Sequence, residues 1–204
     1  MKDVDVARFS RWAESYDRSL LQRLIFEPVH GVLLQRIAEL SPKPTSLLDI
    51  GCGTGRLLRR AAAVFPEARL TGVDPAEEMV EAARAAAPKG SKISVVPGFA
   101  EELPFPAGSF DIATTTMSFH HWEDQPRAIR EVRRVLSPGG LFFLTDIFPR
   151  RFLHWLFARS NHGHFIGPER LARLLEAAGF EPPRFVPLRR FGRRIQVVIA
   201  RAGT

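Results

Sequence analysis

The feature that most constrains this 204-residue chain is a glycine-rich turn within residues 47–57, LLDIGCGTGRL. An apolar run before the glycines reads as a short buried strand, and the residues after them read as an amphipathic helix. Gly51, Gly53 and Gly55 stand between the two, where glycine lets the backbone bend sharply and lets a ligand lie directly on it. This order of strand, turn and helix is typical of nucleotide-binding α/β folds, although dinucleotide-binding proteins share it.

Short apolar runs and amphipathic stretches alternate along the rest of the chain. Strands are expected at 46–51, 68–74, 92–98, 109–119 and 141–148, with two more inside 184–202. Helices are expected at 29–40, 54–65, 76–87, 125–136 and 168–180. We therefore expect an α/β, Rossmann-like fold with a doubly wound seven-stranded sheet, helices on both faces and a C-terminal antiparallel hairpin joined near Gly192.

These elements use the whole chain, so a single domain is expected over residues 1–204. Residues 1–45 read as an N-terminal helical cap on that domain. Residues 149–167, which contain RRFLHWLFARSNHGHF, form the one sizeable insertion and are the natural candidate for a lid.

Positive charge is the compositional feature that bears on partners. The formal net charge is +7 and the sequence pI is about 10.6, with eleven arginines and three glutamates from residue 150 onward. Such a balance indicates an anionic partner, namely nucleic acid, an acidic membrane surface or an acidic small molecule. The arginine- and alanine-rich composition that a GC-rich genome produces explains the same numbers, and we favour that interpretation.

Cysteine usage and apolar runs bear on the compartment. The single cysteine, Cys52, excludes an internal disulfide and is typical of the reducing cytoplasm. The N-terminal residues lack the apolar core of a signal peptide, and no apolar run is long enough to cross a bilayer. A cytoplasmic protein without a transmembrane segment is therefore expected, and its oligomeric state stays open.

An acidic residue follows the glycine turn at the spacing that nucleotide-binding folds use. Asp74 ends the second expected strand, about twenty residues after the turn, where a carboxylate accepts hydrogen bonds from both ribose hydroxyls. The alternative is a helix cap, because Asp74-Pro75-Ala76-Glu77 also resembles the start of a helix. The two roles are compatible with each other.

Five segments together resemble one enzyme family. They are LLDIGCGTGRL, GVDPAEEMV, AEELPFPAGSFD, HHWED and RVLSPGG, and the resemblance runs from about Phe9 to Ala200. They are similar to class I methyltransferases that depend on S-adenosylmethionine (SAM), in particular the ubiquinone/menaquinone-biosynthesis group and its small-molecule relatives. The resemblance implies SAM as cofactor, S-adenosylhomocysteine as product and a small-molecule acceptor, aromatic or quinone-like ones included, that attacks through oxygen, nitrogen or carbon.

The resemblance also implies a set of cofactor-binding residues. They are Tyr16, Asp49, Gly51, Cys52, Gly53, Asp74, Pro75, Met79, Ala100, Glu101 and Thr116. In the family's pattern Gly51 and Gly53 line the methionine part of SAM and Asp49 holds its amino group. Asp74 takes the ribose hydroxyls, and Tyr16 closes over the cofactor.

The adenine end contains the one departure from the family's pattern. Pro75 and Met79 would flank the adenine, and Ala100 and Glu101 would lie near its edge. The family commonly has Asp or Asn just before this alanine to accept a hydrogen bond from the adenine amino group. Here that residue is Phe99, so stacking and backbone groups would recognise the base. One lost hydrogen bond costs about 1 kcal/mol, which does not overturn the assignment.

Two adjacent histidines are the candidates for a catalytic base. His120 and His121 follow the fourth strand, at whose end Thr116 would contact the methionine part of SAM through its backbone. A neutral imidazole there could take a phenol, enol or hydroxyl proton, and His121 is the preferred candidate. The alternative, which we favour, is structural: the pair, with Trp122, ends the strand and packs the next helix.

Several other functions remain as alternatives. A nucleic-acid methyltransferase is disfavoured because TTTMSFHH stands where base-methylating enzymes have an Asn/Asp-Pro-Pro-aromatic segment. A nicotinamide-dependent oxidoreductase would need the third glycine of G-x-G-x-x-G, which is absent. A non-catalytic SAM-binding protein stays open, as does peripheral contact of residues 150–165 with anionic lipid. No metal is expected, because His162 and His164 have neither a cysteine nor a clear acidic partner nearby.

Overall fold

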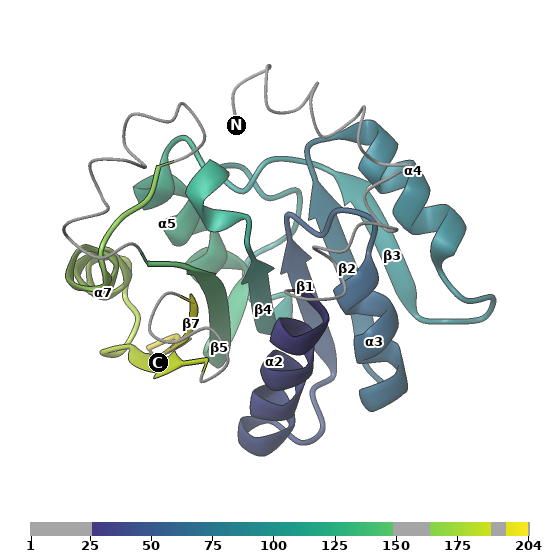
Figure 1. Cartoon of the computed structure of the whole chain (residues 1–204), viewed down its shortest axis with the longest axis horizontal. Coiled ribbons are helices and arrows are strands. Elements are labelled where there is room, and N and C mark those ends of the chain that lie inside the picture. The colour runs from purple at the N-terminus through teal and green to yellow at the C-terminus, as the bar shows by residue number, and fades with distance from the viewer. Residues whose placement is uncertain (1–25, 149–163, 189–194, 204) are drawn as a thin grey trace. The chain divides into compact units, whose positions relative to one another are not determined.

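The computed structural model describes residues 26–148, 164–188 and 195–203. The chain divides into two compact units, Met1–Phe99 and Ala100–Thr204 (Figure 1). Tyr16, most of the expected N-terminal cap and most of the expected lid lie outside the described residues. The expectation of a single domain therefore stays a prediction.

The first unit contains three parallel strands in the order β3-β2-β1. Their bounds are β1 Ser46–Ile50, β2 Arg69–Asp74 and β3 Ile93–Pro97. Every residue of β1 is buried, as the apolar run SLLDI predicts for a strand with neighbours on both faces. The glycine turn follows β1 and Asp74 ends β2, and these two strands are neighbours, with Asp49 opposite Gly72.

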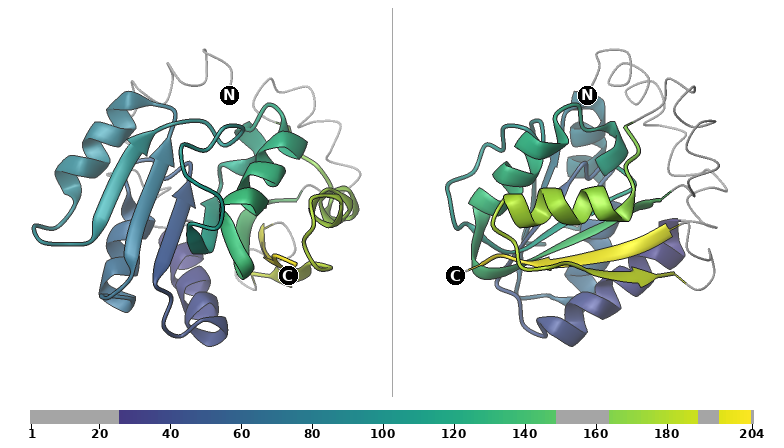
Figure 2. Two further views of the ribbon diagram at one scale, coloured as in Figure 1. Left: turned by 180° about the vertical axis from the view of Figure 1, so that it is seen from behind. Right: turned by 90° about the vertical axis from the view of Figure 1, so that its left-hand side faces the viewer.

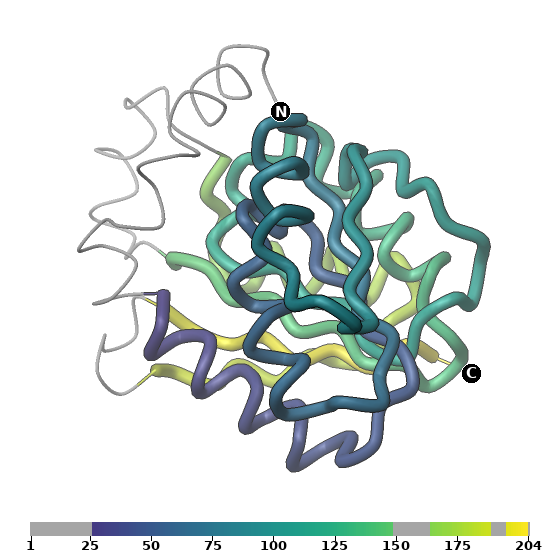
Figure 3. The backbone as a smooth tube through the Cα atoms, turned by 90° about the vertical axis from the view of Figure 1, so that its right-hand side faces the viewer, coloured from purple at the N-terminus to yellow at the C-terminus, as the bar shows by residue number. Residues whose placement is uncertain are grey.

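Three described helices belong to this unit, namely α2 Glu27–Leu40, α3 Arg56–Val64 and α4 Glu77–Ala86. Helices α3 and α4 both contact β2 and β3, and α2 contacts α3. Figure 3 looks from the side of α4 and β3, and it shows the chain returning from α4 into β3. These short returns between parallel strands set the carboxyl ends of β1 and β2 next to the helix N-termini.

Helix α2 forms because apolar residues recur at helical spacing, and it buries that face. Val29, Leu33 and Ile37 are fully buried, as their spacing predicts. Leu40, expected on the same face, is 39% exposed because it is the last residue of the helix. Pro42 and Pro44 follow and cannot continue the helix.

The second unit contains four strands in the order β4-β5-β7-β6. Their bounds are β4 Phe110–Thr116, β5 Leu136–Ile147, β6 Arg184–Pro187 and β7 Ile195–Arg201. β4 and β5 are parallel, whereas β7 is antiparallel to both β5 and β6. The right-hand view of Figure 2 shows β6 and β7 side by side, which confirms the predicted C-terminal antiparallel pair.

The helices of this unit are α5 Gln125–Val135 and α7 Pro168–Ala177, with a short 3-10 helix, η2, at Phe119–His121. Asp124 caps α5, since its side chain accepts the Arg127 N–H at 2.9 Å. The buried face of α5, which includes Ile129 and Val132, faces the unit's interior, and the helix contacts β5 and α7. Phe142 and Phe143 of β5 are the largest fully buried side chains of this unit.

Two strand boundaries differ from those that the sequence predicts. β4 ends at Thr116 rather than at 119, because Met117 has a positive φ of 54° and the chain then enters η2. β5 begins at Leu136, although Ser137 to Gly140 read as a turn. Leu136 pairs with Phe110 of β4 and Leu141 with Ile112, so Ser137 to Gly140 form a bulge within β5, where Gly139 has φ of 73°.

The seven strands and their helices confirm the predicted α/β class. In the described part of the chain, no helix combines the length and the apolar character that a bilayer span needs.

Candidate functional site

The glycine turn has the backbone geometry that only glycine adopts easily. Gly51, Gly53 and Gly55 have φ of 71°, 52° and 73°. The Gly51 and Cys52 N–H groups both donate to the Val73 carbonyl, at 2.8 and 3.1 Å. These two bonds hold the turn against the end of β2, so it is a fixed surface rather than a free loop.

One glycine of the turn leaves the backbone open to a ligand. A Cβ atom on Gly53 would meet no atom of the described residues within 4 Å, whereas one on Gly55 would lie 3.1 Å from the Ala83 Cβ. Gly55 therefore serves the packing of α3 against α4, whereas Gly53 is required by its positive φ and leaves open space beside its backbone. An open backbone face at the carboxyl end of β1 is what a nucleotide-like cofactor needs.

Asp74 completes this surface at the end of β2. Its Oδ2 accepts the Gly53 N–H at 2.8 Å, and its Oδ1 accepts the Ala76 N–H at 3.0 Å. A carboxylate has about four acceptor positions, so lone pairs remain for two hydroxyl groups. Asp74 is 7% exposed, and burial raises its pKa although the two N–H groups oppose the rise. The expected cap role holds in part, because Ala76 rather than Asp74 is the N-cap of α4.

Other predicted cofactor residues of this unit lie along the same two strands and α4. Asp49 is buried in β1, two residues before Gly51, and Pro75 is half-buried directly after Asp74. Met79 is buried in the first turn of α4, where its N–H donates to the Ala76 carbonyl. Open glycine backbone beside a buried carboxylate fits the methionine and ribose parts of SAM.

Cys52 has a packing role inside the turn. A Cβ atom on Gly72 would lie 2.7 Å from the Cys52 Sγ, so the thiol fills the space that the glycine leaves. Burial raises the pKa of this thiol well above its ordinary value, and the carboxylates of Asp74 and Asp49 add to the rise. The thiol stays protonated and is not a nucleophile. The pairing of Cys52 with Gly72 was not predicted from the sequence.

In the second unit, Glu101 is tied to the start of α5. Its Oε1 accepts the N–H groups of Glu123 and Asp124, at 2.8 and 3.4 Å. Ala100, just before it, is 7% exposed. The structure therefore gives Glu101 a backbone-capping role, and the expectation that Ala100 and Glu101 lie near adenine stays a prediction.

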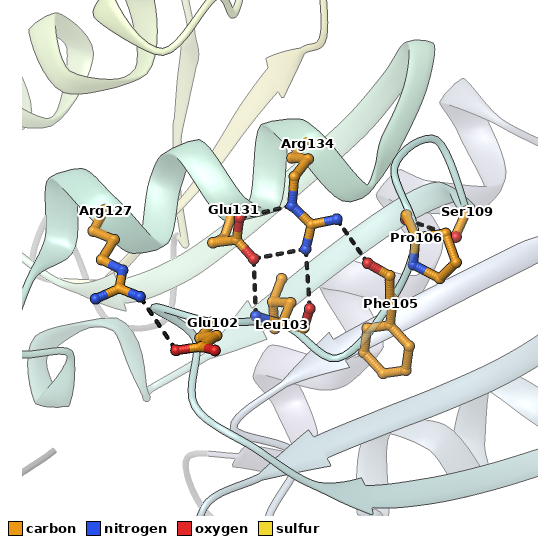
Figure 4. A network of polar contacts seen from close by, with 8 residues as sticks. All are labelled: Glu102, Leu103, Phe105, Pro106, Ser109, Arg127, Glu131 and Arg134. Carbon is orange, nitrogen blue, oxygen red and sulfur yellow. Dashed lines mark hydrogen bonds and ion pairs between the residues drawn. The ribbon is translucent and has the colours of Figure 1, made fainter.

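A charged network holds the loop that follows Glu101 (Figure 4). Arg134 forms a two-fold ion pair with Glu131 at 2.7 Å for both bonds, and it donates to the carbonyls of Phe105 and Leu103 at 2.7 and 3.0 Å. Glu131 in turn accepts the Leu103 N–H at 2.9 Å. The Arg134 hydrogen bond lowers the pKa of Glu131 despite partial burial. This loop is thus fixed to α5 by side chains.

The end of β4 carries strain. Met117 is the one non-glycine residue with positive φ in the described part of the chain, at 54°, and its N–H donates to the Thr145 carbonyl at 2.8 Å. Thr116, before it, has a buried Oγ1 with no hydrogen-bond partner among the described residues. Strained backbone of this kind concentrates at functional sites. Thr116 was predicted as a cofactor contact, and Met117 was not predicted at all.

Three residues after Met117, His120 contacts a buried carboxylate. The His120 Nδ1 lies 2.8 and 3.0 Å from the two carboxylate oxygens of Asp146, and the His120 N–H donates to Asp146 Oδ2 at 3.0 Å. Asp146, on β5, is 2% exposed. Asp146 was not predicted from the sequence, although an acid inside the apolar run LFFLTDIF indicates a buried, partnered carboxylate.

The other predicted histidine lies beside this pair. The His121 ring centroid is 4.0 Å from that of His120, at an interplanar angle of 43°. On its other side His120 stacks on Phe165, with centroids 4.5 Å apart and an angle of 12°. The preference for His121 over His120 as base stays a prediction of the sequence.

The described residues contain no group of three or more His, Cys, Asp or Glu side chains that could hold a metal ion. Tyr16 and His162, both singled out in the sequence, lie outside these residues.

Comparison with known proteins identifies the family. Residues 48–144 match the family model described as a methyltransferase domain. A demethylmenaquinone methyltransferase of Thermotoga maritima is 30% identical, and the match covers 85% of this chain and 86% of that protein. The chain is a class I SAM-dependent methyltransferase. The predicted family, enzyme class and cofactor are thereby confirmed.

Solved structures show that this methyltransferase has the family's fold. A methyltransferase in complex with the Haloferax volcanii Trm112 methyltransferase activator is similar with a TM-score of 0.77 and 20% identity, covering 96% of this chain and 98% of that chain. A SAM-dependent methyltransferase of Aquifex aeolicus has a TM-score of 0.73 and 20% identity, covering 94% and 97%. The predicted Rossmann-like α/β fold with seven strands is confirmed.

Proposed function

We propose that this methyltransferase transfers the methyl group of SAM to a small hydroxylated aromatic acceptor. The Thermotoga maritima relative is named for demethylmenaquinone, and its similarity supports this class of acceptor for the present chain. A quinone ring is electron-poor, whereas its hydroquinone form carries hydroxyl groups that become nucleophilic once deprotonated. The acceptor is therefore a phenol or hydroquinone rather than a quinone.

The main support for SAM binding is the hydrogen bond between the Gly53 N–H and the Asp74 carboxylate. The open backbone at Gly53 would hold the methionine part, and the remaining lone pairs of Asp74 would accept the ribose hydroxyls. SAM supplies, when bound, an electrophilic methyl group on a positively charged sulfur. The residues proposed to hold it are Tyr16, Asp49, Gly51, Cys52, Gly53, Asp74, Pro75, Met79, Ala100, Glu101 and Thr116.

The protein's own residues contribute orientation and water exclusion. The fixed turn presents backbone that needs no rearrangement when a ligand arrives, because its N–H groups are already bonded to β2. Holding two reactants in line can lower the barrier by about 7 kcal/mol or more.

A small-molecule acceptor, rather than a nucleic acid, completes the proposal. The segment TTTMSFHH lacks the Asn/Asp-Pro-Pro-aromatic pattern of base-methylating enzymes. The single, buried Cys52 is compatible with work in the reducing cytoplasm, which we include in the proposal. Peripheral membrane contact would involve residues 150–165, nearly all of which lie outside the described residues.

Calorimetric titration tests the cofactor site. SAM and S-adenosylhomocysteine are titrated into the unaltered chain, the Asp74→Ala variant and a Glu67→Ala control, with NADH as a control ligand. We expect micromolar binding to the unaltered chain and to Glu67→Ala, and binding at least tenfold weaker to Asp74→Ala, because charged hydrogen bonds to the ribose are lost. Equal binding to Asp74→Ala would contradict the assignment.

The acceptor class is tested separately with 1,4-naphthohydroquinone and catechol under reducing conditions. Methylated product is measured by mass spectrometry after incubation with SAM, and the unreduced naphthoquinone serves as the control. We expect product from a hydroquinone and none from the quinone. SAM binding without any methylation of hydroxylated aromatics would reject this acceptor class.

A further inference from the structure

We propose that His120 takes the proton of the acceptor hydroxyl and that Asp146 is the residue that positions it, an inference that rests on the proposed function. The sequence favours a structural role for the pair and, between the two as a base, prefers His121. The contacts of the second unit lead to the other histidine.

The Asp146 carboxylate determines which ring nitrogen of His120 carries a proton. Three groups point at its oxygens: the N–H of Ile147 at 2.6 Å, the N–H of His120 at 3.0 Å and the His120 Nδ1 at 2.8 and 3.0 Å. An ionised carboxylate only accepts hydrogen bonds, so Nδ1 is the donor of that bond. In the neutral ring the proton then sits on Nδ1, and Nε2 keeps a free lone pair that can act as a base.

The ring is held in place from several directions. Phe165 stacks nearly parallel to it, and the His164 N–H donates to the His120 carbonyl at 2.5 Å. The Gln125 side-chain amide donates to the carbonyls of His164 and Phe119, at 2.7 and 3.2 Å. The side chain of His120 is 11% exposed and that of Asp146 is 3% exposed. Little water therefore weakens their hydrogen bond, and one orientation of the ring is fixed.

The titratable groups that these contacts bring to His120 are Asp146 from β5, His121 beside it and His164 through its backbone. Asp146 is the charged partner on a neighbouring element, and its two bonds to the backbone prevent it from turning away. The same logic of a carboxylate that fixes the tautomer of a catalytic histidine is known from hydrolases.

The step balances with these groups alone. The acceptor hydroxyl gives its proton to His120 Nε2, and the ring becomes an imidazolium whose charge Asp146 stabilises. The acceptor oxygen, or a ring carbon activated by it, forms the bond to the methyl carbon. The carbon–sulfur bond of SAM breaks and its electron pair stays on sulfur, which gives S-adenosylhomocysteine. After O-methylation, His120 gives the proton to water. After methylation of a ring carbon, that carbon loses its hydrogen as a proton and the acceptor oxygen regains one, so a single proton is released in either case.

The tautomer is measured first, because it needs no acceptor. The full chain is labelled with ¹⁵N-histidine, and the His120 signals are assigned from a His120→Gln variant. At a pH where the ring is neutral we expect the Nδ1–H form with an unprotonated Nε2, and a mixture of tautomers in Asp146→Asn. A neutral ring protonated on Nε2 in the unaltered chain would overturn the proposal.

Kinetics then separate a base from a structural residue, with 1,4-naphthohydroquinone as acceptor. We expect His120→Ala to lower kcat by about 10²–10⁴-fold, with the Kd for SAM unchanged and added imidazole restoring part of kcat. Asp146→Asn should lower kcat with little change in KM. His121→Ala tests the rival base, and we expect it to lose less kcat than His120→Ala, with no rescue by imidazole. The control is Glu67→Ala, an exposed residue of the first unit that should keep the kcat of the unaltered chain.

The outcomes distinguish the two proposals. Full activity of His120→Ala, or a loss in His121→Ala that imidazole restores instead, would overturn the role of His120. If Asp146→Asn does not fold, the imidazole experiment on His120→Ala decides alone. If the unaltered chain binds SAM but does not methylate the hydroquinone, the proposed acceptor class is wrong. The tautomer measurement, which needs no acceptor, would then still test whether Asp146 positions His120.

Discussion

Gly72 lacks a side chain because the Cys52 thiol occupies the space that one would need. A Cβ atom on Gly72 would lie 2.7 Å from Cys52 Sγ and 2.8 Å from Leu58 Cδ1. We expect Gly72→Ala to lower the free energy of unfolding by about 1–3 kcal/mol, as overpacked cores do. Urea unfolding measures the change.

The contact between Gly72 and Cys52 can be tested with a double-mutant cycle. Cys52→Ala removes Sγ, so the double variant Gly72→Ala with Cys52→Ala should recover part of the loss, although Leu58 stays in place. Gly31→Ala is the matched control, because among the described residues its Cβ would meet only the Arg60 guanidinium, at 3.6 Å. Strictly additive effects of the Gly72 and Cys52 substitutions would show that the two residues do not compete for space.

Phe99 allows a test of adenine recognition, because its side chain is exposed. It is 46% exposed, and the preceding Gly98 N–H donates to the Asp74 carbonyl at 3.1 Å, which keeps Phe99 next to the proposed ribose site. We expect Phe99→Asn to bind S-adenosylhomocysteine about fivefold more tightly, since one hydrogen bond to the adenine amino group is worth about 1 kcal/mol. Calorimetry measures the affinity.

The inosine analogue of S-adenosylhomocysteine, which lacks the amino group, provides the comparison. Phe99→Asn should gain nothing with it, and Phe99→Leu should gain nothing with either ligand. A tighter complex of Phe99→Asn with both ligands would mean that the gain has another cause than a hydrogen bond to the base.

Sequence reasoning succeeds at residues whose role is local. Gly51 and Gly53 are predictable because a sharp turn after a strand needs positive φ, and Asp74 because it ends the next strand. Asp146 is not predictable in the same way, since its partner is 26 residues earlier in the chain and only the fold pairs them. The choice between His120 and its neighbour depends on that pairing, so the sequence alone could not make it.

At the scale of whole elements, helix α5 fixes a neighbouring loop through its side chains. Through Arg134 and Glu131 it holds the carbonyls of Leu103 and Phe105 in the loop before β4. The arginine donates to three partners at once, so its planar guanidinium cannot be replaced by a single charge.

We expect Arg134→Met to lower the free energy of unfolding by about 1–3 kcal/mol, because carbonyl groups and the Glu131 carboxylate lose their donor. Faster hydrogen exchange at the Leu103 amide would report the same loss locally. Arg130→Met, an exposed arginine of the same helix, is the control and should have little effect. Equal exchange rates in the two variants would contradict a positioning role for Arg134.

Element boundaries show where sequence patterns stop being informative. The apolar run 109–119 is longer than β4, because Met117 turns the chain at a position where no glycine or proline signals a break. Ser137 to Gly140 read as a turn by composition, yet they lie in β5. In both places a neighbouring strand decides the conformation, and its position is not visible in the local sequence.

At the scale of the whole molecule, acid stability should depend on one buried histidine. His30 of α2 is 5% exposed, and burial, together with Arg60 and Arg56, lowers its pKa to about 3. The folded state keeps the ring neutral, whereas the unfolded chain binds a proton below about pH 6.5. Stability is therefore complete above that pH and falls as the pH drops towards 3, by about 1 kcal/mol per pH unit.

Urea unfolding between pH 8 and pH 5 measures this slope. The raised pKa of Asp74 contributes with the opposite sign, so the comparison with a His30 variant isolates the histidine. His30→Leu should flatten the profile, whereas His164→Leu, an exposed histidine, should leave it unchanged. A slope that is the same in His30→Leu would assign the acid sensitivity to other groups.

The fold as a whole was more predictable than its working parts. Alternating strands and helices indicate the α/β class, and the resemblance of five segments indicates the family, because both signals are spread along the chain. The charged loop network and the pairing of His120 with Asp146 each join residues that are more than 20 positions apart. Such contacts depend on the packed structure and leave only weak traces in the sequence.

The buried thiol makes this chain convenient for site-selective labelling. Cys52 is the only cysteine, and its raised pKa and burial keep it from reacting with maleimides in the native state. A cysteine introduced at an exposed position, such as Glu67→Cys, would take a single fluorophore without removal of the natural one. The slow rate at which a maleimide modifies Cys52 would then report how often the glycine turn opens. A bound cofactor should lower that rate.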